Sequence, residues 1–124
     1  MKDELVSYEI ATGLKAKGFD LDTRHLYRWD FTDGMPNVDK LFDFIKKEFC
    51  NNKSIARNEF TAPTLSLAQK WLREEKGIYL VVDYTSRWIY KIKSHGDMFV
   101  TKKHNCDTYE LALSKGIEEA LTLI

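Results

Sequence analysis

Apolar residues recur at helical spacing in four stretches of the chain. Residues 2–17 carry apolar positions three and four apart and end before a glycine, and residues 38–50 follow a turn-forming Gly-Met-Pro segment. Residues 61–77 open with Thr-Ala-Pro-Thr, whose proline a first helical turn tolerates, and residues 107–123 begin with acidic residues at a capping-box spacing. These patterns predict four helices. The stripe of the second predicted helix consists of Val38, Leu41, Phe42, Ile45 and Phe49.

Shorter stretches alternate between apolar and polar residues, as half-buried strands do. Residues 25–31 predict a strand in the first half, and residues 78–84, 87–93 and 98–103 predict three more, separated by tight turns. The fold class expected is α+β, with a three-stranded antiparallel meander and helices packed on it. Its C-terminal half reads helix-strand-strand-strand-helix and is preceded by two N-terminal helices.

The simplest domain organisation is a single domain over residues 1–124. The polar, aperiodic loop at 53–60 leaves a division open. It could separate an N-terminal helical part, 1–60, from an α-β-β-β-α module, 61–124.

Period-two alternation assigns the residues of the meander to two faces. One face, which includes Leu80 and Tyr90, is expected to hold the helices of the C-terminal half. The other face includes Tyr79, Val81 and Ile89, and we expect the two N-terminal helices to bury it. On this interpretation the apolar residues of the meander hold its own helices and leave no prepared pocket.

Composition narrows the function classes. The 124 residues contain nineteen Lys and Arg against nineteen Asp and Glu, so the chain lacks the basic excess of proteins that coat nucleic acid. Only two cysteines occur, Cys50 and Cys106, which is typical of a reducing compartment. The N-terminus does not resemble a signal peptide, and no apolar run is long enough to span a bilayer. We therefore expect a cytoplasmic protein that does not enter a membrane.

No motif for catalysis or for cofactor binding is present. The sequence lacks a nucleophile elbow, a phosphate-binding loop, a dinucleotide fingerprint and a two-histidine zinc motif. His104, Cys106 and Asp107 form the nearest approach to a metal cluster, but they lack the paired ligand spacing of a zinc site. We therefore expect a non-enzymatic protein without catalytic residues, cofactor or metal.

Two binding roles remain. Positive charge gathers on the meander while the last helix is rich in Glu, so a neutral chain is electrically divided and could bind an unidentified protein partner or a second copy. This protein–protein role is the main functional hypothesis. The alternative is nucleic-acid binding, because cations interleaved with aromatic residues can neutralise phosphates and stack bases. The residues that would carry the alternative are Arg87, Lys91, Lys93, Lys102 and Lys103.

Two segments of the C-terminal half resemble a known group of proteins. They are Ala62-Pro63-Thr64…Gln69-Lys70-Trp71-Leu72-Arg73-Glu74 and Thr108-Tyr109-Glu110-Leu111-Ala112-Leu113…Gly116-Ile117-Glu118-Glu119-Ala120-Leu121. The group consists of small uncharacterised bacterial proteins carried on prophage-like and other mobile elements of gut anaerobes. The resemblance implies such an origin and implies no activity.

The element order of the C-terminal half is also similar to that of the double-stranded-RNA-binding domain. In that family the RNA contacts come from the first helix, the loop between the first two strands and a basic start of the last helix. Here the corresponding loop is only Thr85-Ser86, and the last helix begins with Asp107 and Glu110. The resemblance therefore implies a topology, and its departures count against duplex RNA binding at that site.

Overall fold

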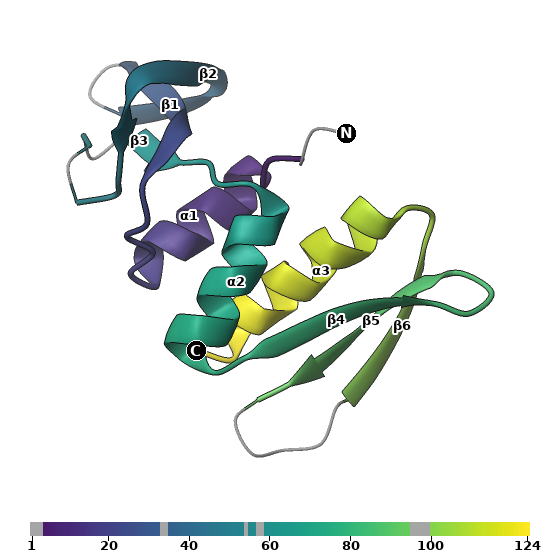
Figure 1. The fold of residues 1–124 in the computed structure, drawn as a ribbon. Helices are drawn as coiled ribbons and strands as arrows, with labels where there is room; N and C mark the ends of the chain where they lie inside the picture. Colours follow the sequence, from purple (N-terminus) through teal and green to yellow (C-terminus); the bar gives the residue numbers. More distant parts are fainter. Residues whose placement is uncertain (1–3, 33–34, 54, 57–58, 95–99) are drawn as a thin grey trace. The chain divides into compact units, whose positions relative to one another are not determined.

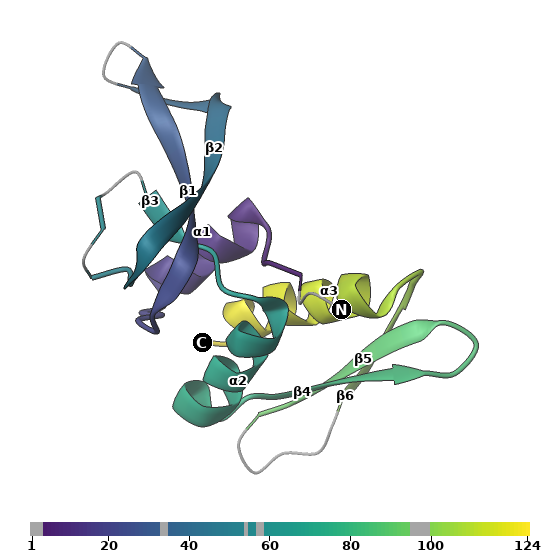
Figure 2. The ribbon, with the colours of Figure 1, turned by 45° about the horizontal axis from the view of Figure 1, so that its top comes forward.

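The computed structural model describes residues 4–32, 35–53, 55–56, 59–94 and 100–124 (Figures 1 and 2). The chain forms two compact units, one made of Val6–Pro63 and the other of Met1–Leu5 with Thr64–Ile124. The α+β class fits, but the expected single sheet with two N-terminal helices is wrong, because there are two separate antiparallel sheets. In the described part of the chain, no helix is long and apolar enough to cross a membrane.

The N-terminal unit combines one helix with an antiparallel sheet. Its elements are α1 (Tyr8–Ala16), β1 (Thr23–Thr32), β2 (Met35–Cys50) and β3 (Glu59–Thr61). Strand β1 lies between β2 and β3 and pairs with both. The strand expected at 25–31 is therefore present as β1.

The second predicted helix, at 38–50, is wrong, because these residues belong to strand β2. Thr32 pairs with Met35 and Thr23 with Cys50, so β2 runs back along the whole of β1. The apolar stripe fits a helical period, but the sequence Phe42-Asp43-Phe44 also alternates as a strand does. Pairing with β1 makes these residues a strand, because tertiary contacts override the small intrinsic preference of a segment for helix or strand.

Helix α1 is shorter than the predicted stretch 2–17 because its cap lies further along the chain. The Ser7 hydroxyl accepts the Ile10 N–H at 3.3 Å and so begins the helix. At the other end Gly18 adopts a φ of +92°, and the Phe19 N–H donates to the Leu14 carbonyl at 2.9 Å. Phe19 is buried against the last turn, so the predicted glycine stop is confirmed.

The C-terminal unit places two helices against an antiparallel sheet. Its elements are α2 (Leu65–Lys76), β4 (Tyr79–Tyr84), β5 (Trp88–Lys93), β6 (Val100–Cys106) and α3 (Tyr109–Thr122). Strand β5 pairs with β4 on one side and with β6 on the other. Figures 1 and 2 show α3 running across one face of this sheet.

Local signals in the sequence fix both helices of this unit. Thr64 caps α2 by accepting the Leu67 N–H at 3.2 Å, and Gly77 ends it with a φ of +68°. Helix α3 begins one residue later than expected, because Thr108 and not Asp107 is its cap. The buried residues of α3 form one stripe, which consists of Ala112, Leu113, Gly116, Ile117, Ala120 and Leu121.

Candidate protein-binding surface

The two faces of the β4–β5 pair have different surroundings. Tyr90 and Leu80 lie on one face: the Tyr90 hydroxyl bonds to Glu119 of α3, and the Leu80 side chain lies against Gly116 of α3. We call this the inner face. The register pairs Tyr79 with Lys93, Val81 with Lys91 and Asp83 with Ile89 on the opposite face. We call these six residues the outer face.

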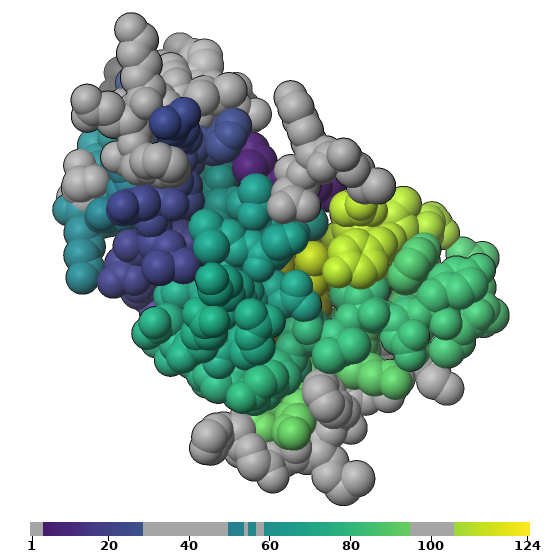
Figure 3. Space-filling model, viewed as in Figure 1, coloured from purple at the N-terminus to yellow at the C-terminus, as the bar shows by residue number. Residues whose placement is uncertain are grey.

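Two of the three apolar side chains on the outer face are open to solvent. Tyr79 is 39% exposed and Val81 is 43% exposed, whereas Ile89 is buried. In the space-filling view, residues of β4 and β5 reach the surface (Figure 3, green). The grouping of these residues on one face was predicted correctly, but the expectation that two N-terminal helices bury them is wrong. The residues of the second predicted helix form strand β2, and the side chains of Tyr79 and Val81 are exposed.

Charged side chains border the apolar residues of the outer face. Lys91 forms an ion pair with Asp83 across the two strands, with the Nζ and Oδ2 atoms 3.4 Å apart. The Lys93 ammonium group lies 5.7 Å from the centre of the Tyr79 ring, which is within cation–π range. The outer face is therefore an apolar strip that carries two cations and one carboxylate.

The other predicted cationic residues lie elsewhere. Arg87 follows the turn at the end of β4 and pairs with Asp107 at 2.9 Å between its Nη1 and Oδ1. Lys102 is paired with Tyr90 through the backbone of β6. The side chains of Lys102 and Lys103 lie outside the described residues, so the structure brings only Lys91 and Lys93 together.

A shallow hollow of about 330 Å³ lies where β4 turns into β5. The rings of Tyr84 and Trp88 are 5.0 Å apart, and Trp88 contacts Tyr109 edge-on at 5.7 Å. Tyr84 is 58% exposed, so this cluster is a separate exposed apolar site, on the same side of the sheet as Leu80 and Tyr90. The lining residues are Tyr84, Ser86, Arg87, Trp88, Cys106 and Asp107.

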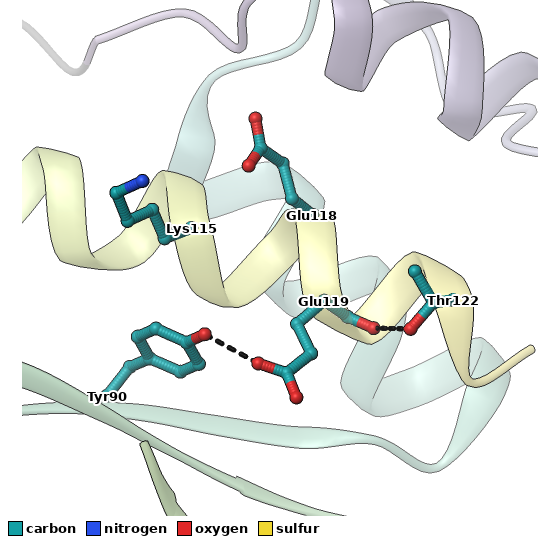
Figure 4. A pocket seen from close by; sticks show the side chains of 5 residues that line it. All are labelled: Tyr90, Lys115, Glu118, Glu119 and Thr122. Carbon is teal, nitrogen blue, oxygen red and sulfur yellow. Dashed lines mark hydrogen bonds between the residues drawn. The ribbon is translucent and has the colours of Figure 1, made fainter. Parts of the chain in front are cut away.

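A second pocket, of about 290 Å³, opens between the inner face and α3 (Figure 4). At its base the Tyr90 hydroxyl donates to Glu119 Oε2 at 2.5 Å. Burial, and then the hydrogen bond to the Glu119 carboxylate, raise the pKa of Tyr90 above its ordinary value. A tyrosine with a raised pKa stays protonated and is a poor base or nucleophile. The remaining lining residues are Lys115, Glu118 and Thr122.

The Tyr90–Glu119 pair therefore acts as a hydrogen bond that ties α3 to the sheet. Sequence reasoning placed Tyr90 on the inner face but did not give it a partner. A buried tyrosine usually finds an acceptor for its hydroxyl, which was the available signal. Among the residues that the structure describes, no group of three His, Cys, Asp or Glu could hold a metal ion.

Comparison with known proteins adds no relative. No family model, curated protein or solved structure matches this chain. Any functional assignment must therefore come from the site itself, and the outer face presents two exposed apolar side chains, Tyr79 and Val81.

Proposed function

We propose that this chain is a non-enzymatic protein of a mobile element that acts by binding another protein through the outer face. The observation that carries the proposal is the exposure of Tyr79 and Val81 on β4, the edge strand of a regularly paired sheet. An exposed apolar patch that polar residues border supports a role as an interaction surface.

The composition of the outer face is typical of a binding interface. Interfaces have an apolar centre, in which tyrosine is enriched, and a polar rim that remains accessible to water. On the outer face, Tyr79 and Val81 provide apolar contact area, and Lys91, Lys93 and Asp83 lie beside them as charged neighbours. Tyrosine is also among the residues that contribute most to binding energy.

The charges of the outer face indicate the chemistry of the partner. Asp83 already pairs with Lys91, whereas Lys93 lies over the Tyr79 ring. A partner with an apolar patch bordered by carboxylates would cover Tyr79 and Val81 and place negative charge beside both lysines. Such complementarity raises the association rate and excludes partners of like charge.

The same contacts favour protein over nucleic acid as the ligand. Two of the three predicted cations whose side chains are described, Arg87 and Lys91, pair with carboxylates of this chain. A phosphate backbone would have to compete with Asp107 and Asp83 for them. Carboxylates of a protein partner would compete with Asp83 in the same way, but a protein partner also gains from covering Tyr79 and Val81. Binding to nucleic acid also depends on the number of cations that contact phosphates, and paired cations contribute less to it.

Affinity capture with two matched variants tests the proposal. Val81→Glu changes the outer face, and Leu111→Glu changes a residue of α3 with nearly the same exposure, 42% against 43%. The wild-type chain and L111E should retain the same acidic-rimmed partner, and V81E should bind it at least about tenfold more weakly. With the purified partner, titration calorimetry should give the same order of affinities.

Two results would contradict this proposal. One is equal binding of the partner by V81E and L111E, which would place the interface elsewhere. The other is retention on heparin that falls steeply with salt, with no protein partner enriched, which would favour the nucleic-acid alternative.

A further inference from the structure

Strand β4 has a free edge, and the hydrogen-bond pattern shows which of its groups point there. The Thr85 N–H donates to the Arg87 carbonyl at 3.2 Å, so the hydrogen-bonded pairs with β5 involve the odd-numbered residues of β4. The backbone groups of Leu80, Val82 and Tyr84 therefore point away from β5. The Gln69 side chain confirms this direction, because its Nε2 donates to the Leu80 carbonyl at 2.7 Å.

Two of the edge groups already have partners within the chain. Gln69 occupies the Leu80 carbonyl, and the Tyr84 N–H donates to Asp83 Oδ1 at 2.8 Å. The others are the Leu80 N–H, the Val82 N–H and carbonyl, and the Tyr84 carbonyl. Among the residues that the structure describes, these four groups have no hydrogen-bond partner.

The β4 edge also has little of the usual protection against pairing with another strand, since Asp83 is the one charged residue of β4. Edges are commonly protected by lysine, proline or a bulge, and the sequence Tyr-Leu-Val-Val-Asp-Tyr has a regular register without either residue. Three of its six side chains, those of Tyr79, Val81 and Tyr84, are exposed and apolar. The sequence of β6, at the other edge of the sheet, contains Lys102 and Lys103 and pairs with a register shift.

We propose that the β4 edge pairs with the β4 edge of a second copy of this chain, antiparallel and centred on Val82. In this register each Val82 N–H donates to the Val82 carbonyl of the other copy, and each Leu80 N–H donates to the Tyr84 carbonyl of the other copy. All four open groups of each copy are then used. The two occupied groups, the Leu80 carbonyl and the Tyr84 N–H, face each other.

Neighbouring registers use the edge less well. A pairing centred on Val81 leaves the Tyr84 carbonyl without a partner. A pairing centred on Asp83 sets two carboxylates directly opposite each other, which is destabilising in an antiparallel pair. The Val82 register is therefore the one that the open groups select. This pairing uses the strand edge and leaves the outer face accessible. A test of the pairing is therefore independent of a test of the proposed binding function.

Sedimentation equilibrium of the full chain tests the pairing. The weight-average mass should rise with concentration from 14.5 kDa towards twice that value. Val82→Pro removes the central donor, which points away from β5, so the β4–β5 ladder keeps its hydrogen bonds. We expect V82P to weaken the dimer at least about tenfold, because two intermolecular bonds are lost. A wild-type chain that stays monomeric at all concentrations would overturn the inference.

Cysteine crosslinking tests the register independently of how V82P folds. Residues of a hydrogen-bonded antiparallel pair have Cα atoms about 5.5 Å apart, within reach of a disulfide. Val82→Cys should therefore form an intermolecular disulfide on mild oxidation much faster than Val81→Cys. The wild-type chain, which retains Cys50 and Cys106, is the control. Equal crosslinking of V82C and V81C, or protection of the Val82 amide only when a different protein is added, would overturn the second-copy pairing.

Discussion

Replacing Tyr90 with Phe removes one oxygen atom from the contact between β5 and α3. Tyr90 is only 2% exposed, and its hydroxyl oxygen lies 2.5 Å from Glu119 Oε2. A short O–H···O⁻ distance of this kind marks a charge-assisted hydrogen bond. Such bonds contribute about 1.5–3 kcal/mol, so we expect Y90F to lower the free energy of unfolding by about 2 kcal/mol.

Urea unfolding followed by tryptophan fluorescence and far-ultraviolet circular dichroism measures this loss. Tyr84→Phe is the matched control, because it removes the same atom from a residue that is 58% exposed. We expect Y84F to stay within about 0.5 kcal/mol of the wild-type chain, as surface changes do. If Y90F changed the free energy of unfolding no more than Y84F, the hydroxyl would not be a structural donor.

A double-mutant cycle with Glu119→Gln assigns the loss to the pair. If Tyr90 and Glu119 stabilise the fold through each other, the double variant should lose less than the sum of the two single variants, by about 1 kcal/mol or more. Strict additivity would mean that each side chain acts through other neighbours.

Alkaline pH gives a second readout of the same contact. The pKa of Tyr90 is raised in the folded state, so the folded chain keeps a proton that the unfolded chain releases above about pH 10. The stability from Tyr90 is therefore complete below about pH 10 and is lost as the pH rises further, by about 1.4 kcal/mol per pH unit. Y90F lacks this loss, so the difference between the two chains should narrow above pH 10. A constant difference would contradict the raised pKa.

Three further changes test the packing of the C-terminal unit by the same unfolding assay. Trp71→Ala should lower the free energy of unfolding by about 3–5 kcal/mol, because Trp71 is 2% exposed; a loss below about 0.5 kcal/mol would place the indole at the surface. Gly116→Ala should lower it by about 1 kcal/mol, since the new Cβ would lie 2.4 Å from Leu80 Cδ1 and overpacking outweighs the gain in helix propensity. Thr108→Ala should lower the free energy of unfolding by about 1 kcal/mol, because it removes the cap of α3. Asp107→Ala should lower it by less than about 0.5 kcal/mol, because it removes only a surface ion pair. Equal losses in the two variants would contradict the assignment of Thr108 as the cap.

The C-terminal unit follows from its sequence because its elements begin and end at strong local signals. Thr64 and Gly77 bound α2 with a side-chain cap and a left-handed residue. The apolar pattern of α3 extends over enough residues to distinguish a helix from a strand. These signals act within a few residues, so sequence reasoning could find them.

The N-terminal unit was harder to predict because its decisive contacts lie far apart in sequence. Residues 38–50 satisfy a helical stripe, and only the pairing of Cys50 with Thr23 at the distant end of β1 makes them a strand. The outer face shows the same limit. Alternation grouped Tyr79, Val81 and the lysines correctly, but whether another element covers them depends on the fold of the whole chain.

The Tyr90–Glu119 pair also depends on tertiary structure. The two residues are 29 positions apart and belong to a strand and a helix. The sequence shows several acidic residues on α3, and only the packing of the helix on β5 selects Glu119 as the acceptor. Similarly, the backbone groups at the free edge of β4 are those of the residues that do not bond to β5. Alternation of apolar and polar residues does not show which residues these are.

The two ends of the segment Val6–Pro63 meet, because the Val6 N–H donates to the Pro63 carbonyl at 2.9 Å. Next to them, Leu5 and Thr64 form an antiparallel bridge, and the Leu65 N–H donates to the Glu4 carbonyl at 2.8 Å. The segment thus leaves and rejoins the rest of the chain through a two-stranded stem. Inserts with adjoining ends are the kind that a host fold gains or loses most readily. A tight turn is long enough to join Leu5 to Thr64 directly, so a short turn can replace the whole segment Val6–Pro63 without moving these two ends.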